Sequence, residues 1–289
     1  MIGQSHAIIR SLKLKMIEKS TAAWYDRHIF LKGVEFMNYT DLVFDLYGTL
    51  VDIHTDENAA AWEKTALYFG YYGAHYTGES LKEDHSSVMT KLESAAGQSY
   101  EMYPDIPFDE VLAELFRRKG IHDRADELGL QAAQIFRVTS TEYIRLYNGV
   151  LEALAAFRSK GYRLWLLSNA QRAFTEYELR HLCLGPQFDK VYLSSDYRCR
   201  KPDLRFFEVL LKDQKLDPSK CLMIGNDRET DIAGASAAGM STLYMHTNLT
   251  PSHQAAAMPE RFPDSGTGRK HYEFEGSNWD ELTRFICSL

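Results

Sequence analysis

The 289-residue sequence has few cysteines, no excess of basic residues and no long apolar run. Its four cysteines are scattered and form no CxxC pair, which excludes a disulfide framework and a cysteine-based metal site. Such usage is typical of reduced thiols in a cytoplasmic protein. The net charge of −7 lacks the basic footprint of a nucleic-acid-binding protein. Because no apolar run is long enough to span a bilayer, we expect no membrane partner either.

Residues 1–36 are unlike the rest of the chain. The stretch from Ile8 to Phe36 is mildly basic and lacks the apolar segment and cleavage site of a secretory signal. We interpret residues 1–36 as an N-terminal extension of uncertain role and place the start of the folded part at Met37.

From Met37 onward, short apolar runs alternate with amphipathic helical patterns. The predicted strands are Leu42–Phe44, Arg163–Leu167, Lys190–Leu193, Cys221–Ile224, Thr242–Met245 and Tyr272–Phe274. The helices predicted around these strands are Val150–Ser159, Gln171–Leu182, Leu204–Gln214, Asp231–Ala238 and Trp279–Ile286. This alternation is typical of a parallel sheet with helices on both faces. The expected fold class is therefore α/β, with a Rossmann-like three-layer core.

The interval between residues 56 and 147 breaks this alternation, because it has no good strand pattern. Its apolar residues recur at helical spacing in Ala59–Tyr71, Glu79–Ser94, Phe108–Lys119 and Leu130–Leu146. An all-helical block inserted after the first strand predicts a second domain at the strand's carboxyl end, where open α/β sheets bind ligands. We assign residues 37–55 and 148–289 to the core and residues 56–147 to a helical cap.

Polar residues follow the apolar strands in a fixed order. Asp45 begins the segment DLYGTL after the first strand, and Ser168-Asn169 follow the second. Lys201 precedes a predicted helix, and Asp227 and Asp231 follow the strand Cys221–Ile224. Each alone is ordinary turn or capping chemistry. Together they place a nucleophilic carboxylate, a hydroxyl, a lysine and an acidic pair at one edge of the sheet.

These four motifs, in this order, resemble those of the haloacid dehalogenase superfamily. The helical insertion after the first motif resembles the C1-type cap of subfamily I. The resemblance covers Met37 to the C-terminus. It implies a Mg²⁺-dependent hydrolase, most often a phosphatase of a small phosphorylated metabolite. Asp45 occupies the position of the nucleophile, which forms an aspartyl-phosphate intermediate.

The resemblance also implies roles for the other motif residues. Ser168 and the backbone N–H groups around Asn169 would bind the phosphate oxygens. Lys201 would pair with the phosphate and restrain the nucleophile, while Thr49 would orient the nucleophile's loop.

A magnesium ion is expected at the same place. Its ligands would be the carboxylate of Asp45, the backbone carbonyl of Tyr47 and the carboxylate of Asp227, with Asp231 as a second ligand or as support.

Tyr47 departs from the family pattern, because phosphatases usually carry there a second aspartate that serves as general acid and base. A phenol is a poor base for activating water. Either Asp52 or His54 replaces it, or hydrolysis is slow, or the reaction is not ordinary phosphomonoester hydrolysis. The simplest interpretation is that the Tyr47 ring packs at the cap boundary and only its carbonyl is used.

Tyrosine at this position also occurs in metal-independent 2-haloacid dehalogenases, which gives the first alternative function. Against it, this chain keeps the motif-four carboxylates and has Phe207 where those enzymes have tyrosine. No cap arginine that would grip a substrate carboxylate is apparent in residues 72–76.

A second departure is Asn226, which stands directly after Gly225 where an aspartate is commoner. Either Asp227 takes over as metal ligand through a one-residue shift, or the neutral amide of Asn226 weakens magnesium binding.

A non-catalytic relative that binds a phosphorylated ligand is the other alternative function. The sequence identifies neither the substrate nor the oligomeric state.

Overall fold

The computed structural model describes residues 39–96, 103–255 and 269–289. The N-terminal extension, residues 1–36, lies outside the described residues. Within the described ranges, no helix combines the length and the apolar character needed to cross a membrane.

The core is built on a six-stranded parallel sheet in the order β5-β4-β1-β6-β7-β8. The strands are β1 (Asp41–Phe44), β4 (Arg163–Ser168), β5 (Lys190–Leu193), β6 (Cys221–Gly225), β7 (Ser241–His246) and β8 (His271–Glu275). Each predicted strand is confirmed, with ends shifted by at most one residue. The central strand β1 is fully buried, as expected of a parallel sheet that is covered on both faces.

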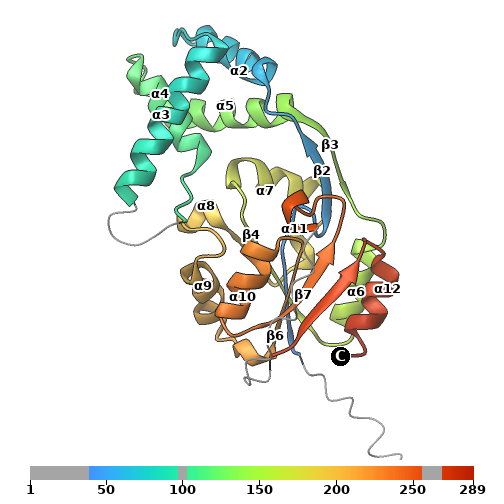
Figure 1. Cartoon of the computed structure of the whole chain (residues 1–289). Coiled ribbons are helices and arrows are strands. Elements are labelled where there is room, and N and C mark those ends of the chain that lie inside the picture. The colour runs from blue at the N-terminus through green and yellow to red at the C-terminus, as the bar shows by residue number, and fades with distance from the viewer. Residues whose placement is uncertain (1–38, 97–102, 256–268) are drawn as a thin grey trace, which may run out of the picture. The chain divides into compact units, whose positions relative to one another are not determined.

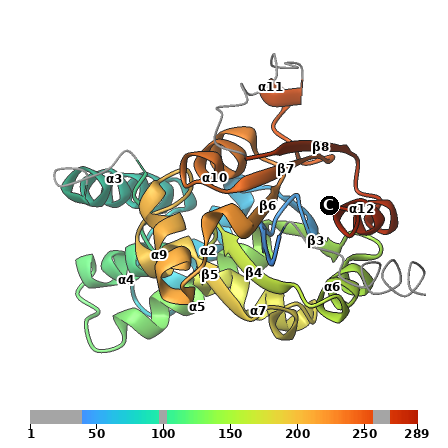
Figure 2. The ribbon, with the colours of Figure 1, turned by 90° about the horizontal axis from the view of Figure 1, so that it is seen from below.

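Helices cover the two faces of the sheet (Figures 1 and 2). The core helices are α6 (Val150–Ser159), α7 (Arg172–His181), α8 (Ser194–Tyr197), α9 (Leu204–Gln214), α10 (Ala233–Ala237), α11 (Ser252–Ala255) and α12 (Trp279–Ile286). Short turns η1 (Gly185–Gln187), η2 (Pro218–Lys220) and η3 (Arg228–Ile232) connect them to the strands.

Successive side chains of β1 point to opposite faces of the sheet, and each face packs against its own layer of helices. Phe44 packs on one side against Phe157 of α6 and Trp279 of α12, with ring centroids 6.1 and 6.3 Å apart. Val43 faces the other side, in an apolar cluster that includes Phe206 and Phe207 of α9. The predicted three-layer α/β core is confirmed, and both of its apolar layers fix the position of the strand that precedes Asp45.

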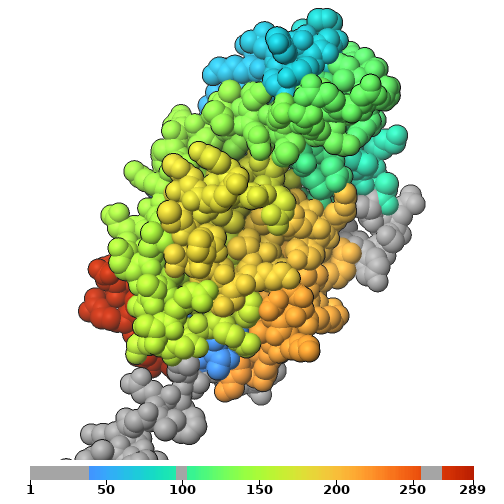
Figure 3. All heavy atoms as spheres, turned by 180° about the vertical axis from the view of Figure 1, so that it is seen from behind, coloured from blue at the N-terminus to red at the C-terminus, as the bar shows by residue number. Residues whose placement is uncertain are grey.

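The cap contains α2 (Ala59–Tyr71), α3 (Gly78–Ala96), α4 (Phe108–Arg118) and α5 (Ala125–Ser140). It has its own apolar cluster, in which the rings of Phe69 and Phe116 stack with centroids 3.9 Å apart. Figure 3 shows the yellow surface of α7 against the green cap. Ala173 of α7 belongs to the cap's apolar cluster, so the cap and the core share a packed boundary.

The interval assigned to the cap is not all-helical, which corrects one expectation. Its last predicted helix ends at Ser140, and β3 (Thr141–Leu146) follows. This strand pairs antiparallel with β2 (Val51–Thr55), so the two chain crossings between core and cap form a two-stranded ribbon. The sequence pattern suggested a helix here because β3 has only isolated apolar residues. Since no residue of the strand is fully buried, it lacks the continuous apolar run that marks the core strands.

Candidate active site

Lys201 lies at the centre of the predicted cluster. Its Nζ atom donates to Asp45 Oδ1 at 2.7 Å, to Asp231 Oδ1 at 2.7 Å and to the carbonyl of Leu167 at 2.8 Å. Lys201 is only 1% exposed. All three donors of the ammonium group are therefore used, and the lysine holds two carboxylates together at the carboxyl ends of β1, β4 and β6.

Burial controls the charge of this cluster. Burial alone would lower the pKa of Lys201, but the neighbouring Asp231 and Asp45 outweigh it and raise this pKa, so the lysine stays charged. Burial raises the pKa of Asp231 to about 7 against the opposing effect of Lys201. Two aspartates and one lysine leave an excess of negative charge when all are ionised, and this favours a cationic ligand.

The loop after β1 turns tightly so that Asp45 faces the cluster. Gly48 has φ +83°, and a Cβ atom there would lie 2.2 Å from Nδ2 of Asn226. Only glycine fits this position. Thr49 donates towards Asp45 Oδ2 at 3.4 Å and Asn226 Oδ1 at 3.3 Å. The threonine therefore joins the Asp45 loop to motif four.

Asn169 has a structural function that its motif position did not reveal. Its side chain donates to the carbonyl of Lys201 at 3.0 Å and accepts from the backbone N–H of Lys201 at 2.8 Å. This reciprocal pair fixes the lysine's backbone. The neighbouring Ser168 donates to Asp45 Oδ1 at 3.4 Å, which brings the predicted phosphate-binding hydroxyl next to the predicted nucleophile.

The Tyr47 hydroxyl points away from Asp45 into a buried polar network. It bonds to Glu178 and, at 2.9 Å, to Thr175, both on α7. Burial and the adjacent Glu178 carboxylate raise the pKa of the Tyr47 phenol far above its ordinary value. Such a phenol is a weak acid, and the arrangement agrees with a ring that packs at the cap boundary.

Glu178 also connects the core to the cap. Arg137 of α5 donates to its two carboxylate oxygens at 2.7 and 3.2 Å, and both side chains are largely buried. Sequence reasoning missed both residues, because neither belongs to a motif and only the fold brings α5 and α7 together. We refer to Arg137 and Glu178 as the cap–core ion pair.

Motif four places its two candidate metal ligands differently. The Oδ1 atom of Asp227 accepts from the backbone N–H groups of Glu229 and Thr230 at 2.8 and 3.0 Å, which caps the turn η3. The amide oxygen of Asn226 instead shares the Thr49 hydroxyl with the nucleophile. Asn226 is thus linked to Asp45 through the Thr49 side chain, whereas the Asp227 carboxylate caps the turn that follows it.

Magnesium prefers hard oxygen ligands, so the donors around Asp45 can be tested for fit. No three histidine, cysteine, aspartate or glutamate side chains converge as a metal site within the described ranges. The oxygens around Asp45 include the Ser168 and Thr49 hydroxyls, each 3.4 Å from its carboxylate. The Asn226 amide oxygen is linked to Asp45 through Thr49, and the Asp231 carboxylate through Lys201. These donors fit magnesium in chemical type, with one carboxylate replaced by an amide.

Two adjoining cavities follow from this geometry. The first has a volume of about 240 Å³ and is lined by Asp45, Ser168, Lys201 and the residues of motif four. The second, of about 370 Å³, lies between core and cap and is lined by Asp105, Arg137, Arg200 and α7. Tyr47 and Asn169 line both, so the two cavities adjoin each other.

Asp52 and His54 line neither cavity. Asp52 is bound by Arg145 at 2.7 Å and by Asn248 at 3.0 Å, and it stabilises the ribbon. His54 is exposed and lies 3.7 Å from Glu142. The structure therefore does not bring the two suggested replacements for a general acid to the site.

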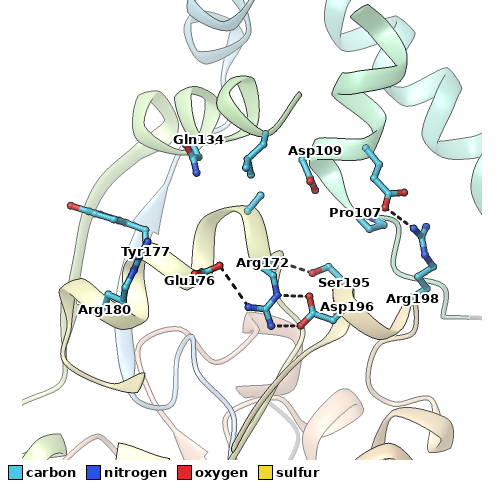
Figure 4. A pocket seen from close by; sticks show the side chains of 13 residues that line it. Pro107, Asp109, Gln134, Arg172, Glu176, Tyr177, Arg180, Ser195, Asp196 and Arg198 are labelled. Atoms are coloured by element: carbon cyan, nitrogen blue, oxygen red, sulfur yellow. Dashed lines mark hydrogen bonds and ion pairs between the residues drawn. The ribbon is translucent and has the colours of Figure 1, made fainter. Parts of the chain in front are cut away.

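A third hollow, of about 530 Å³, is larger but contains no motif residue (Figure 4). It lies between α4, α5, α7 and α8. Arg172 is paired there with Asp196 and Glu176, and Arg198 is paired with Glu110, as the dashed lines show. Arg172 and Arg198 are thus neutralised by neighbouring carboxylates.

Comparison with known proteins places this site in a family. A family model described as a haloacid dehalogenase-like hydrolase matches residues 42–239, which is more than half of the chain. A glyceraldehyde 3-phosphate phosphatase of Methanothermobacter thermautotrophicus is 32% identical over 111 residues, which span 38% of this chain and 49% of that protein. A pyrimidine 5'-nucleotidase of Streptococcus pneumoniae is 24% identical over 221 residues, 76% of this chain and 89% of that protein.

The solved structures show the fold. The 2-haloacid dehalogenase of Pseudomonas syringae has a TM-score of 0.58 and 21% identity, over 86% of this chain and 98% of that one. With the family model matched across four motifs that meet around Lys201, the chain belongs to the haloacid dehalogenase-like hydrolases.

Proposed function

We propose that this hydrolase is a phosphatase of a small phosphorylated metabolite, with Asp45 as its nucleophile and Mg²⁺ as its cofactor. The observation that carries the proposal is the buried ammonium group of Lys201, which holds the Asp45 carboxylate at 2.7 Å in a cavity at the sheet's carboxyl edge. Phosphoryl transfer needs a positioned nucleophile and positive charge near the transferred group, and this cavity provides both.

In the proposed reaction, an oxygen of Asp45 forms a bond to phosphorus while the bond to the leaving oxygen breaks. Lys201 and the Ser168 hydroxyl stabilise the charge on the phosphoryl oxygens. Water then attacks phosphorus, which releases phosphate and restores the Asp45 carboxylate. With the Tyr47 phenol bound to Glu178, we expect no strong general acid, so the rate should depend steeply on how readily the leaving group departs.

For the cofactor, we propose ligation by the Asp45 carboxylate, the Tyr47 carbonyl and the Asn226 amide oxygen. Asp227 and Asp231 are the alternative ligand and the supporting carboxylate. A bound Mg²⁺ would supply positive charge against the phosphoryl oxygens. If Asn226 is the ligand, Asn226→Asp should tighten Mg²⁺ binding in calorimetry at least tenfold, whereas Asp227→Asn should change it little.

A metal-independent 2-haloacid dehalogenase is the second candidate, and the amide of Asn226 favours it. One carboxylate fewer at the site weakens the argument for a metal. Halide release from 2-chloropropionate in the presence of a chelator would support this candidate.

None of the four cysteines is in a disulfide, which suits a reducing compartment, and we place the proposed activity in the cytoplasm.

The test is hydrolysis of p-nitrophenyl phosphate, whose leaving group departs without help from a general acid. We expect turnover that requires Mg²⁺ and that falls at least a thousandfold in Asp45→Asn. Turnover that persists in Asp45→Asn would contradict the assignment of the nucleophile. Absence of turnover with metal, together with halide release from 2-chloropropionate, would favour the dehalogenase.

A further inference from the structure

The second cavity contains an arginine that the motifs do not explain. Arg200 directly precedes Lys201 and lines the space between core and cap. It is exposed, and it forms no ion pair within the part of the chain that the structure describes. By contrast, Arg137 in the same lining is already neutralised by Glu178. Arg200 is therefore the cation of this lining without a carboxylate at ion-pair distance among the described residues, although its charge acts on the nearby Asp105.

The backbone of Arg200 is held in place. Its N–H donates to the carbonyl of Tyr103 at 3.1 Å, and its carbonyl accepts from Asp203 at 3.0 Å. The next residue, Lys201, is fixed on both sides by Asn169. A guanidinium group on a fixed backbone loses less entropy when it binds a ligand. Guanidinium groups also bind carboxylates through two parallel hydrogen bonds.

Asp105 of the cap lines the same cavity and limits which ligands fit. It accepts a hydrogen bond from Gln171 at 2.8 Å, and its partial burial raises the pKa of its carboxyl group. This carboxylate repels an anion placed beside it but accepts hydrogen bonds from a hydroxyl or an ammonium group. The charge of Arg200 opposes this rise in the pKa of Asp105, so the two groups lie close enough to interact. The lining therefore offers a cation for an anionic group and, near it, an acceptor for a hydroxyl or an ammonium group.

On the basis of the proposed phosphatase function, we propose that the second cavity binds the leaving group of a phosphorylated hydroxy- or amino-carboxylic acid, with Arg200 holding its carboxylate. The cavity of about 370 Å³ adjoins the nucleophile's cavity through Tyr47 and Asn169, as a leaving group attached to the phosphoryl group requires. Arg200 is then a specificity-determining residue that contacts the substrate without taking part in bond cleavage.

The test compares two phosphoesters whose alkoxide leaving groups are similar in size and depart with similar ease. A difference in kcat/KM then reports on substrate binding. 3-Phosphoglycerate carries a carboxylate and glycerol 3-phosphate does not. We expect kcat/KM at least tenfold higher for 3-phosphoglycerate. Arg200→Gln should bring the ratio close to one by raising KM for 3-phosphoglycerate.

Arg198→Gln is the matched control, because Arg198 is two residues away but is paired with Glu110 in the third hollow. It should keep the preference for 3-phosphoglycerate. The proposal is overturned if the wild-type protein does not discriminate, or if Arg200→Gln discriminates as well as the wild type.

Calorimetry on the Asp45→Asn variant separates this inference from the proposed function. Stronger binding of 3-phosphoglycerate than of glycerol 3-phosphate, lost with Arg200→Gln, would support the subsite even if no phosphoester were hydrolysed. Hydrolysis of p-nitrophenyl phosphate without any carboxylate preference in binding or turnover would retain the phosphatase and reject the subsite.

Discussion

At the scale of single residues, the site depends on the charge balance around Lys201. The lysine is 1% exposed and bonds to both Asp45 and Asp231. Removing one partner of a buried ion pair leaves the other charge uncompensated, which costs more than the pair itself contributes. The same ammonium group that orients the proposed nucleophile therefore also stabilises the fold.

Lys201→Met should reduce phosphatase turnover below detection and lower the free energy of unfolding by about 3–5 kcal/mol. Adding Asp231→Asn should restore part of the stability, because it removes one of the two uncompensated carboxylates, but it should not restore turnover. Urea denaturation measures both variants, with the exposed Lys212→Met as control. Equal stability of Lys201→Met and wild type would contradict the charge-balance argument.

At the scale of elements, the cap–core ion pair connects α5 with α7. Arg137 and Glu178 are largely buried, and Glu178 also accepts the Tyr47 hydroxyl. The pair thus joins the cap, the core and the nucleophile's loop, at the boundary where cap closure would exclude water from the site.

Glu178→Gln should destabilise the protein by about 3 kcal/mol, because it leaves the Arg137 charge buried without a counter-ion. The matched control is Glu208→Gln, which breaks an exposed pair one helical turn apart in α9 and should change stability by about 0.5 kcal/mol or less. Chemical denaturation followed by tryptophan fluorescence compares the two. If both variants lost similar amounts of stability, burial would not strengthen the contribution of the cap–core ion pair.

His85 of α3 makes the cap sensitive to acid. Its ring lies 5.2 Å from Trp62 and 4.8 Å from Phe108, and its Nε2 atom has no hydrogen-bond partner among the described residues. Burial lowers the pKa of His85 to about 4. Between this value and the ordinary pKa of about 6.5, the unfolded chain binds a proton that the folded cap does not.

Stability should therefore fall as the pH decreases below about 6.5, with a slope from His85 of up to about 1.4 kcal/mol per pH unit. Thermal unfolding between pH 7 and pH 5 measures the slope. His85→Phe should remove this contribution, while replacement of the exposed His181 by phenylalanine should retain it. An unchanged slope in His85→Phe would show that another group causes the acid sensitivity.

The elements that could be predicted are those whose patterns are local. The core strands are continuous apolar runs because both of their faces are buried, and α2, α6, α9 and α12 match their predicted ranges. The ribbon could not be predicted, because β2 and β3 recognise each other across about 90 intervening residues of cap. In the site, the position after a strand located Asp45, and the position before a predicted helix located Lys201. The partnership of Tyr47 with Glu178 and the exposure of Arg200 depend on tertiary packing and were not visible in the sequence.

At the scale of the whole molecule, cap and core divide the proposed work. The core supplies the nucleophile, the lysine and the acidic groups, and the cap supplies one wall of the adjoining cavity through Asp105 and Arg137. In this proposal the chemistry resides in the core, whereas substrate choice is shared between the cap wall and Arg200 of the core. A change in the cap wall should alter which phosphoester reacts without altering the bond that Asp45 makes.

The most direct test of the central claim is to identify the atom to which the phosphoryl group is transferred. The purified protein is mixed with a ³²P-labelled phosphoester and Mg²⁺, quenched in acid within a single turnover and digested. We predict that the label is on the peptide containing Asp45, is released by hydroxylamine as expected of an acyl phosphate, and is absent from Asp45→Asn. Label on another residue, or substrate hydrolysis with no labelled peptide, would contradict the account.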